Sequence, residues 1–459
     1  MRENFGPDVE IVIFNDGHIG GRLEVVNMED EGKPPSEYEI GGTVIHPKNQ
    51  VMHDLVKAAG LQPRIRHPAS TSEDDGRFTI YGSPGEEALF QTYFVNKYLQ
   101  ALELCWHYGL RSLYNMNSLV SDLLQKFAKV YTFLDFGHWK DTEAMFNTIG
   151  GQPTNRLIGR SLTQDLEGHA VGRTLIEELV TVAVRVNYGQ MPESIHAFVG
   201  YISLAGAEGG LWSIEGGNWK LPQALVDLSQ ARLVKSRVMS VKRQLVDNRS
   251  DQDLKTASEK LVATTSDGSE HVFDIIVVAA PQTSDKSPLD MSDVVTLSFP
   301  GNYHRTVATL VRSQGGLNPK FFNIKKGQLT SVNFFVNNAS LINSVSKIYP
   351  ASHQEKDLNV YKVFSQDLLS YDVLDSMFNN RSKTVVADWL AYPHYKASEN
   401  SPWPQPFKLA HNLYYTSAVE WAGSAMEMSA IAAKNVANFA FNEWFEVKQM
   451  NGSSTKTEL

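Results

Sequence analysis

Residues 9–47 read VEIVIFNDGHIGGRLEVVNMEDEGKPPSEYEIGGTVIHP, and this stretch decides the fold. Its apolar, β-branched beginning predicts a short buried strand that ends at the turn Asn15-Asp16-Gly17. Two glycine pairs follow, Gly20-Gly21 and Gly41-Gly42. Glycine permits positive φ and lets backbone N–H groups approach an anion without a Cβ in the way. Arg22 offers a planar fork of donors for a phosphate. Two such turns after one strand predict a nucleotide-cofactor site.

Composition excludes several other classes of protein. At 459 residues the chain is long enough for roughly three domain-sized units, and its net charge of -9 gives no general attraction to nucleic acid. Its single cysteine, Cys105, excludes a disulfide framework and a Cys-x-x-Cys pair. We expect Cys105 to be a buried core thiol. The 13 histidines lack metal-ligand spacing, so no metal site is predicted.

The sequence shows no membrane-spanning run and no signal peptide. No apolar stretch approaches the roughly 20 residues that a span needs, and the residues after Met1 are charged and polar. Asn-x-Ser/Thr acceptor patterns occur at Asn248, Asn338, Asn380 and Asn451, and the first three are the candidate glycosylation sites.

The first half of the remaining chain is mainly helical in pattern. Residues 51–61 predict a helix, 62–87 a loop or small hairpin, and 89–134 a long helical region. An apolar stripe runs along that region through Leu119, Leu123, Phe127, Val130 and Leu134. We interpret the stripe as a core face; the alternative is an apolar wall or membrane-facing lip that admits a long apolar ligand.

The second half combines strands with a terminal helix. Residues 231–246 predict one strand and 274–281 a buried parallel strand of a nucleotide-binding sheet. Residues 294–388 predict a second, mostly antiparallel sheet. The helix expected over 424–447 has small residues on one side, which permit close packing. Its N-terminus, with free N–H groups and the positive end of the helix dipole, is suited to face a cofactor phosphate.

Several segments together carry a family resemblance. Residues 20–47 resemble FAD-contacting segments of the amine-oxidase-like flavoproteins. With later stretches the chain resembles, over nearly its whole length, the prenylcysteine oxidase (prenylcysteine lyase) family; these stretches are VRVNYGQ at 184–190, GLWSIEGGN at 210–218, WLAYPHYK at 389–396 and SAMEMSAIAA at 424–433. The resemblance implies an α/β fold with a Rossmann-like FAD/NAD(P)-binding domain and a discontinuous α+β substrate domain.

The resemblance also divides the chain. Residues 1–62 would form part of the FAD-binding half, and 85–450 the prenylcysteine lyase/oxidase domain. Within the latter, 205–285 and 410–447 would complete the FAD-binding domain, whereas 89–200 and 294–400 would form the substrate side.

The chain departs from the family pattern at its beginning. The first strand and its Gly-x-Gly-x-x-Gly loop are absent, and residues 1–7 look like the end of the helix that follows them. Asn15 stands where the family places an acidic residue for the ribose hydroxyls. Either the chain is N-terminally truncated or it has lost tight FAD binding. Because a missing central strand exposes sheet edges, we expect reduced stability and aggregation.

The family assigns site residues but no catalytic base. The cofactor contacts that it implies are Asn15, Gly20, Gly21, Arg22, Gly41, Gly42, Val44, His46, Val238, Glu420, Ala425 and Met426. His394 is also singled out by the family match. Aromatic candidates for the isoprenoid pocket are Trp212, Tyr392, Tyr395 and Trp421.

The implied activity is that of an FAD-dependent thioether oxidase in the catabolism of prenylated proteins, located in the lysosome or secreted. S-farnesyl- or S-geranylgeranylcysteine would give a hydride to a non-covalently bound flavin. Water addition would then release cysteine and a prenyl aldehyde, with hydrogen peroxide formed from dioxygen. Peripheral membrane contact is a further expectation. Two alternatives are an amine-oxidising flavoenzyme and a flavin-free, lipid-binding or interaction glycoprotein.

Overall fold

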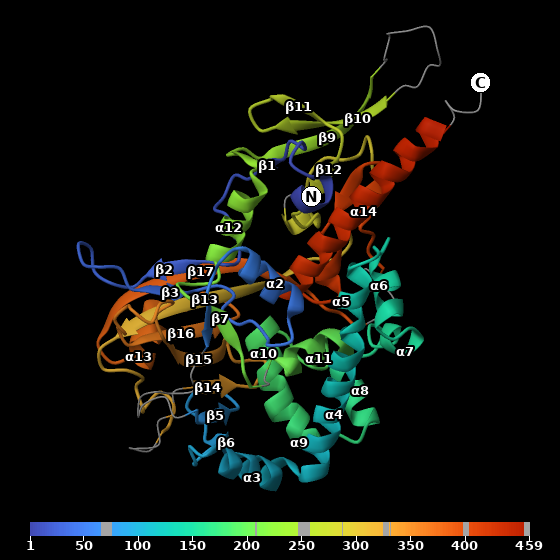
Figure 1. Cartoon of the computed structure of the whole chain (residues 1–459). Coiled ribbons are helices and arrows are strands. Elements are labelled where there is room, and N and C mark those ends of the chain that lie inside the picture. Colours follow the sequence, from blue (N-terminus) through green and yellow to red (C-terminus); the bar gives the residue numbers. More distant parts are fainter. Residues whose placement is uncertain are drawn as a thin grey trace.

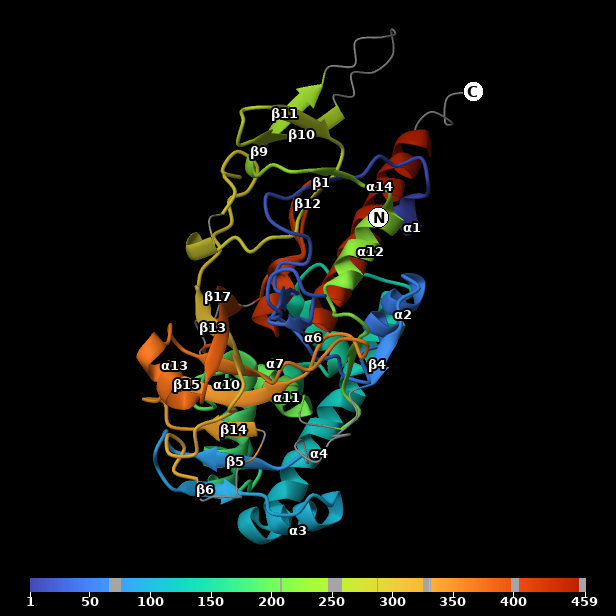
Figure 2. The same ribbon diagram turned by 90° about the vertical axis from the view of Figure 1, so that its left-hand side faces the viewer.

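The computed structural model describes residues 1–65, 76–206, 209–246, 258–286, 288–324, 330, 332–397 and 404–453. Helix α3 (Lys97–Tyr108) lies at one end of the molecule in Figure 1 and in Figure 2. A small antiparallel sheet lies at the opposite end, formed by β9 (Val238–Val246), β10 (Ser258–Thr265) and β11 (Glu270–Phe273). A large sheet and a layer of helices lie between these two ends.

The strands predicted for a nucleotide-binding sheet occur in two separate pieces. β1 (Val12–Phe14) runs parallel to β8 (Arg232–Val234), and β12 (Ile276–Val278) runs parallel to β19 (Leu413–Tyr415). β18 (Lys408–Ala410) extends the second piece as an antiparallel strand. Among the described residues no ladder joins β1 to β12, although they lie near each other in Figures 1 and 2. Each of these two strands therefore has one edge without a β partner in the described part of the chain.

The predicted single strand over 231–246 is wrong, because the segment forms two strands in different sheets. β8 ends at Val234, where the N–H of Ser236 donates to the Val234 carbonyl at 2.9 Å and turns the chain. β9 then begins at Val238 and pairs with β10 in another sheet. The alternating valines on both sides of this turn gave one apparent pattern.

The large sheet has seven strands in the order β17-β13-β16-β15-β14-β5-β6. Their bounds are β17 (Arg381–Pro393), β13 (Tyr303–Ser313), β16 (Val360–Ser365), β15 (Ile342–Ile348), β14 (Val332–Phe335), β5 (Phe78–Tyr81) and β6 (Ala88–Gln91). The pairs are antiparallel except β14 with β5, which confirms the mostly antiparallel sheet. The loop or small hairpin predicted over 62–87 contains β5, which forms an antiparallel hairpin with β6 and also joins the large sheet, with Ile80 and Tyr81 buried.

Two short ladders hold the N-terminal glycine segments. β2 (Val25–Asn27) pairs with β3 (Glu37–Glu39), directly between the two glycine pairs. β4 (Pro63–Ile65) pairs with β7 (Trp212–Ile214), and an additional bridge joins Ile45 to Trp212.

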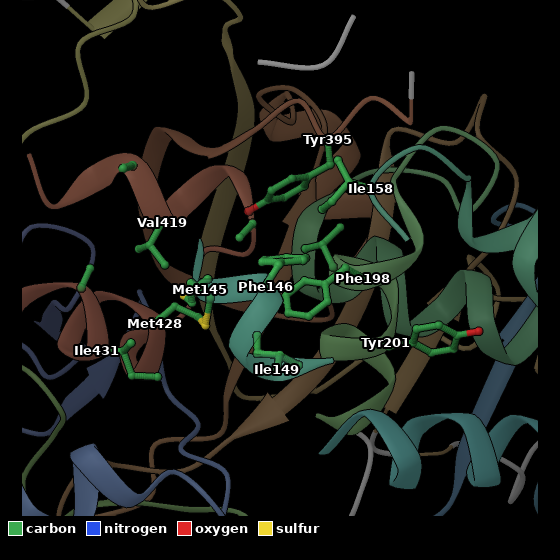
Figure 3. Close-up of a cluster of buried hydrophobic side chains, with 14 of the residues drawn as sticks. Met145, Phe146, Ile149, Ile158, Phe198, Tyr201, Tyr395, Val419, Met428 and Ile431 are labelled. Atoms are coloured by element: carbon green, nitrogen blue, oxygen red, sulfur yellow. The ribbon is translucent and has the colours of Figure 1, made fainter. Parts of the chain in front are cut away.

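The main hydrophobic core lies among the helices. They are α4 (Leu110–Phe127), α5 (Lys129–Leu134), α6 (Thr142–Ile149), α7 (Gln152–Asn155), α8 (Leu162–Gly168), α9 (Arg173–Leu175), the π-helical turn η1 (Ile176–Val180), α10 (Thr181–Tyr188) and α11 (Ala197–Ala205). Phe146 and Phe198 meet at 4.3 Å between ring centroids, and Figure 3 shows Met428 and Ile431 beside them. The stripe at 119–134 faces this core, which confirms the core interpretation; Leu123, Val130 and Leu134 are buried.

The terminal helix α14 (Met426–Ser453) packs closely, as predicted. Ile431 and Ala432 are fully buried, and Phe5 of α1 (Arg2–Phe5) meets Phe441 at 5.4 Å. The Glu427 carboxylate accepts the first N–H groups of α2 (Gln50–Ala58), at 3.0 Å from Val51 and 2.9 Å from Met52. Helix α12 (Lys220–Ser229) and turns η2 (Ser284–Lys286) and η3 (Ser417–Trp421) flank this region, and α13 (Tyr371–Met377) packs on the large sheet.

Cys105 departs from its prediction. It is partly exposed rather than buried, because α3 lies at the surface and turns its Leu104 and Tyr108 side chains inward.

Candidate functional site

The first glycine pair forms a tight turn that other residues would strain. Gly20 has φ +112° and Gly21 has φ +56°, and the N–H of Leu23 donates to the Gly20 carbonyl at 3.0 Å. A Cβ at Gly20 would also lie 2.8 Å from the Leu23 carbonyl oxygen. The positive φ predicted for this pair is therefore confirmed, and the close contact seen here is with the chain's own backbone.

The second pair, Gly41-Gly42, needs glycine only because the backbone at Arg22 comes too close to leave room for a Cβ. The N–H of Gly42 donates to the Arg22 carbonyl at 3.0 Å, and a Cβ on Gly41 would overlap that same carbonyl oxygen. Neither residue has positive φ, so the conformational reason expected for this pair does not apply. The structure thus brings the two glycine segments into direct contact.

Two residues that the sequence did not single out fix this contact. Lys362 on β16 is 4% exposed, and its ammonium donates to the carbonyls of Gly41 at 3.0 Å and Glu39 at 3.3 Å. The Asn218 amide donates to the Gly42 carbonyl at 3.1 Å, and its backbone N–H donates to the Glu39 carboxylate at 2.8 Å. Lys362 and Asn218 therefore fix the Gly41-Gly42 segment by binding the carbonyl groups of both glycines. Asn218 lies in a family-matching stretch, which was the only available signal for it.

Arg22 links the N-terminal turn to the C-terminal part of the chain. Its guanidinium donates to the Glu420 carboxylate at 3.0 Å, to the Ser424 hydroxyl at 3.1 Å and to the Ala391 carbonyl. Glu420 on η3 is 5% exposed, whereas the Arg22 side chain is 37% exposed. Burial opposes the charge of Arg22, but the Glu420 carboxylate outweighs it and raises the pKa of Arg22.

A second cation lies beside Arg22. The Lys286 ammonium is 5.1 Å from the centroid of the Tyr303 ring and donates to the Leu390 carbonyl at 3.0 Å. Burial, followed by the charge of Arg22, lowers the pKa of Lys286. Two carboxylates, Glu420 and Asp285, face these two cations, so the cluster has no formal excess of either charge, and its cationic side chains are the groups that can bind an anionic ligand.

Three of the four predicted aromatic residues gather around these charges. The Tyr395 hydroxyl accepts the Ser424 N–H at 2.8 Å, and the Tyr392 ring lies 5.1 Å from Tyr188. The Trp421 ring is 6.2 Å from Tyr303. Burial raises the pKa of Tyr395 well above its ordinary value, so this phenol is neutral.

Trp212 lies in a different cluster. It stacks on His53 at 4.5 Å and packs with Ile45 and Met52. Its buried indole N–H has no hydrogen-bond partner among the described residues.

The remaining predicted cofactor residues occupy three places. Ala425 and Met426, both half-buried, lie at the start of α14 next to Ser424. Val44 is 37% exposed, and the Nδ1 of His46 accepts the Lys48 N–H at 3.1 Å. Asn15 follows β1 and donates from its amide to the Gly17 carbonyl at 3.0 Å, while Val238 begins β9. Neither Asn15 nor Val238 contacts Arg22 in the structure.

Other predicted residues lie outside this cluster. The His394 ring is 5.0 Å from His304, whose pKa burial lowers to about 4. Asn338 and Asn380 are exposed, and Asn248 lies outside the described residues. No group of metal-ligating side chains occurs in the part of the chain that the structure describes. Among the described residues, no helix combines the length and hydropathy that a membrane span requires.

The comparison with protein families matches residues 94–452 to the family described as prenylcysteine lyase. The chain belongs to the prenylcysteine lyase family. Prenylcysteine oxidase 1 of Bos taurus is 31% identical, with 97% of this chain and 85% of the relative covered. Prenylcysteine oxidase 1 of Homo sapiens is 32% identical, with 97% of this chain and 86% of the relative covered. Prenylcysteine oxidase 1-like of Mus musculus is 29% identical, covering 97% and 88%.

Solved structures share the fold of this prenylcysteine lyase family member. A triple mutant of putrescine oxidase has a TM-score of 0.57 at 11% identity, with 95% of this chain and 93% of that chain covered. Cyclohexylamine oxidase from Brevibacterium oxydans IH-35A has a TM-score of 0.57 at 13% identity, with 95% of this chain and 93% of that chain covered. These likenesses confirm the predicted α/β fold class with its Rossmann-like part.

Proposed function

We propose that the chain is an FAD-dependent thioether oxidase that converts S-prenyl-L-cysteine, dioxygen and water into cysteine, a prenyl aldehyde and hydrogen peroxide. Family membership and the relatives' name, prenylcysteine oxidase, support the substrate class and the oxidation. In this reaction the carbon–sulfur bond breaks, the prenyl carbon is oxidised to the aldehyde level, dioxygen is reduced by two electrons, and water supplies the aldehyde oxygen.

The observation that carries the proposal is the contact between the glycine turns and the Arg22–Glu420 pair. A Cβ at Gly41 would overlap the Arg22 carbonyl, so the turn leaves no room for a side chain beside Arg22. Arg22 and Lys286 supply cationic donors there, and Ser424 precedes the N-terminus of α14. These residues fit a dinucleotide, which needs donors for its phosphates and side-chain-poor backbone along its rings.

The chain's own residues bind and orient in this proposal. Arg22 would hold an anionic part of the cofactor, and Glu420 keeps the guanidinium in place. Tyr392, Tyr395 and Trp421 would exclude water and offer apolar surface to the prenyl chain. When bound, FAD supplies the two-electron oxidation and its reversal by dioxygen. No side chain is assigned as catalytic base, because orientation in a dry site accounts for most of what this reaction needs.

Lysosomal location, with secretion as the alternative, is also proposed on the family resemblance. The exposed side chains of Asn338 and Asn380 are accessible to glycosylation in either compartment. Expression in cultured cells with and without an N-glycosidase treatment should show a mobility shift, and this shift should become smaller in the paired Asn338→Gln and Asn380→Gln variant, which keeps Asn248.

The test is reconstitution with FAD followed by two substrates. We expect peroxide and prenyl aldehyde in equal amounts from S-farnesyl-L-cysteine, and neither from putrescine. Peroxide from putrescine alone would instead identify an amine oxidase. The Arg22→Met variant should lose flavin absorbance after gel filtration while keeping a native circular dichroism spectrum.

A second candidate is a flavin-free member that binds lipid or a partner. The specific observations in its favour are Asn15 at the end of β1 and the absence of a ladder between β1 and β12 among the described residues. A purified chain that binds prenylcysteine but acquires no flavin absorbance at high FAD concentration would support this candidate and contradict the oxidase.

A further inference from the structure

Helix α3 has an apolar face on each side. Leu104 and Tyr108 turn inward and pack against the main core. Tyr98, Leu102 and Trp106 are spaced by four residues and therefore share the opposite face. They are 84%, 64% and 93% exposed. An ordinary surface helix has polar residues on its outer side, so this outer face requires an explanation.

The exposed apolar surface continues on both sides of α3. Tyr93 precedes the helix and is 61% exposed, and Leu110 and Tyr114 on α4 are 71% and 70% exposed. We call these six residues the α3 patch: Tyr93, Tyr98, Leu102, Trp106, Leu110 and Tyr114. Single exposed apolar residues are normal on proteins, but a concentration within one short segment marks an interaction surface.

The fully exposed charges next to the patch are cationic. Lys97 and Arg111 are exposed, whereas Glu103 is only partly exposed. The Glu103 carboxylate is engaged within the protein, where it accepts the Tyr93 N–H at 3.0 Å. The patch thus presents positive charge to solvent although the whole chain has a net charge of -9.

The position of α3 suits a flat partner. The helix runs across one end of the molecule in both Figure 1 and Figure 2, and no other element extends beyond it there. A surface touching this end would meet the outer face of the helix along its length.

We infer that the α3 patch inserts into the interfacial layer of an anionic membrane. Tyrosine and tryptophan, with apolar rings and a polar tip, are the side chains that prefer this layer, and leucines extend deeper. Lys97 and Arg111 would lie at the level of the lipid headgroups, where anionic lipids attract them. A second copy of the chain is a poorer occupant, because a symmetric contact would bring the cations of both copies together.

Vesicle flotation tests this inference, and it requires no enzymatic activity or flavin. The whole chain should float with phosphatidylcholine vesicles that contain phosphatidylserine, and less with phosphatidylcholine alone. The Tyr98→Glu/Trp106→Glu double variant should partition about tenfold more weakly, because two inserted rings are replaced by charges. Phe136→Glu is the matched control: Phe136 is 89% exposed but lies outside the patch, so its variant should float like the unaltered chain.

A second measurement covers the case in which the double variant misfolds. Brominated lipids should quench part of the tryptophan fluorescence, and this quenched part should disappear in Trp106→Phe, which keeps an aromatic ring. Equal flotation of the unaltered chain and the correctly folded double variant would overturn the inference. So would light scattering that shows a lipid-independent dimer lost in the double variant. Failure of the oxidase assay would leave the membrane inference unaffected.

Discussion

At the scale of single residues, the two glycine pairs serve the same site for different physical reasons. Gly20 and Gly21 adopt backbone angles that L-residues avoid, whereas Gly41 has ordinary angles but no space for a Cβ. The sequence shows both pairs equally well. Only the structure shows that the second pair is required by its contact with the Arg22 carbonyl.

Gly41→Ala should therefore destabilise the protein by about 2–4 kcal/mol, because the added methyl must displace backbone rather than a flexible side chain. Gly17→Ala is the matched control. Gly17 has no atom within 4 Å of an added Cβ and no positive φ, so its substitution should change stability by less than about 1 kcal/mol. Urea unfolding of both variants measures the difference, and equal midpoints would contradict this account of the turn.

Arg22 and Glu420 give a second residue-scale prediction. Arg22→Met should lower the free energy of unfolding by about 1–2 kcal/mol, because the buried Glu420 carboxylate would lose its cationic partner. The loss should not be larger, because Arg22 is partly exposed and water screens its attraction to Glu420. Adding Glu420→Gln should recover most of that stability but should not restore flavin binding. If the double variant binds FAD as tightly as the unaltered chain, Arg22 is not a cofactor ligand.

At the scale of elements, His196 joins α11 to η3. Its Nδ1 accepts the Val199 N–H at 3.2 Å, so its Nε2–H donates to the Trp421 carbonyl at 3.1 Å. This arrangement requires the neutral ring, and burial lowers the pKa of His196 to about 4. The unfolded chain, with an ordinary histidine pKa near 6.5, binds the proton more readily.

Stability contributed by neutral His196 is therefore complete above about pH 6.5 and is lost as the pH falls toward 4. The loss between pH 7 and pH 5 should be about 2 kcal/mol. His304 shifts in the same direction and adds to the effect. His196→Gln should unfold with a shallower pH dependence over this range than the unaltered chain; an unchanged dependence would show that His196 is not the group responsible.

Element-scale prediction from sequence succeeded where one segment carries its own periodicity. The helices α2 and α14 and the antiparallel sheet that contains β13 and β14 follow from local patterns. A small hairpin was one alternative for the segment that contains β5, but the pairing of β5 with β14 was not predicted, because β14 lies far along the chain and a strand of four residues shows little alternation. For the same reason, nothing local distinguishes Lys286 and Lys362 from other lysines. Their importance comes from backbone carbonyls that other elements supply.

At the scale of the whole molecule, the parallel strands form two pieces where a dinucleotide-binding sheet would be continuous. β1 and β12 each have an edge without a β partner among the described residues. Fusing a designed strand–Gly-x-Gly-x-x-Gly–helix segment before Met1 should join the pieces. We expect a higher melting temperature, less aggregation, and at least a tenfold lower dissociation constant for FAD, because a helix N-terminus would be added for the pyrophosphate. A fusion with proline in the added strand is the control.

The central claim is that these scattered segments enclose a flavin that oxidises a prenyl thioether. The most direct measurement is the absorbance of the FAD-loaded chain, unmodified or carrying the fused segment, mixed anaerobically with S-farnesyl-L-cysteine. The claim predicts that the absorbance of the oxidised flavin falls after anaerobic mixing with this substrate. The same absorbance should return when dioxygen is admitted. A bound flavin whose spectrum stays oxidised at saturating substrate would contradict it.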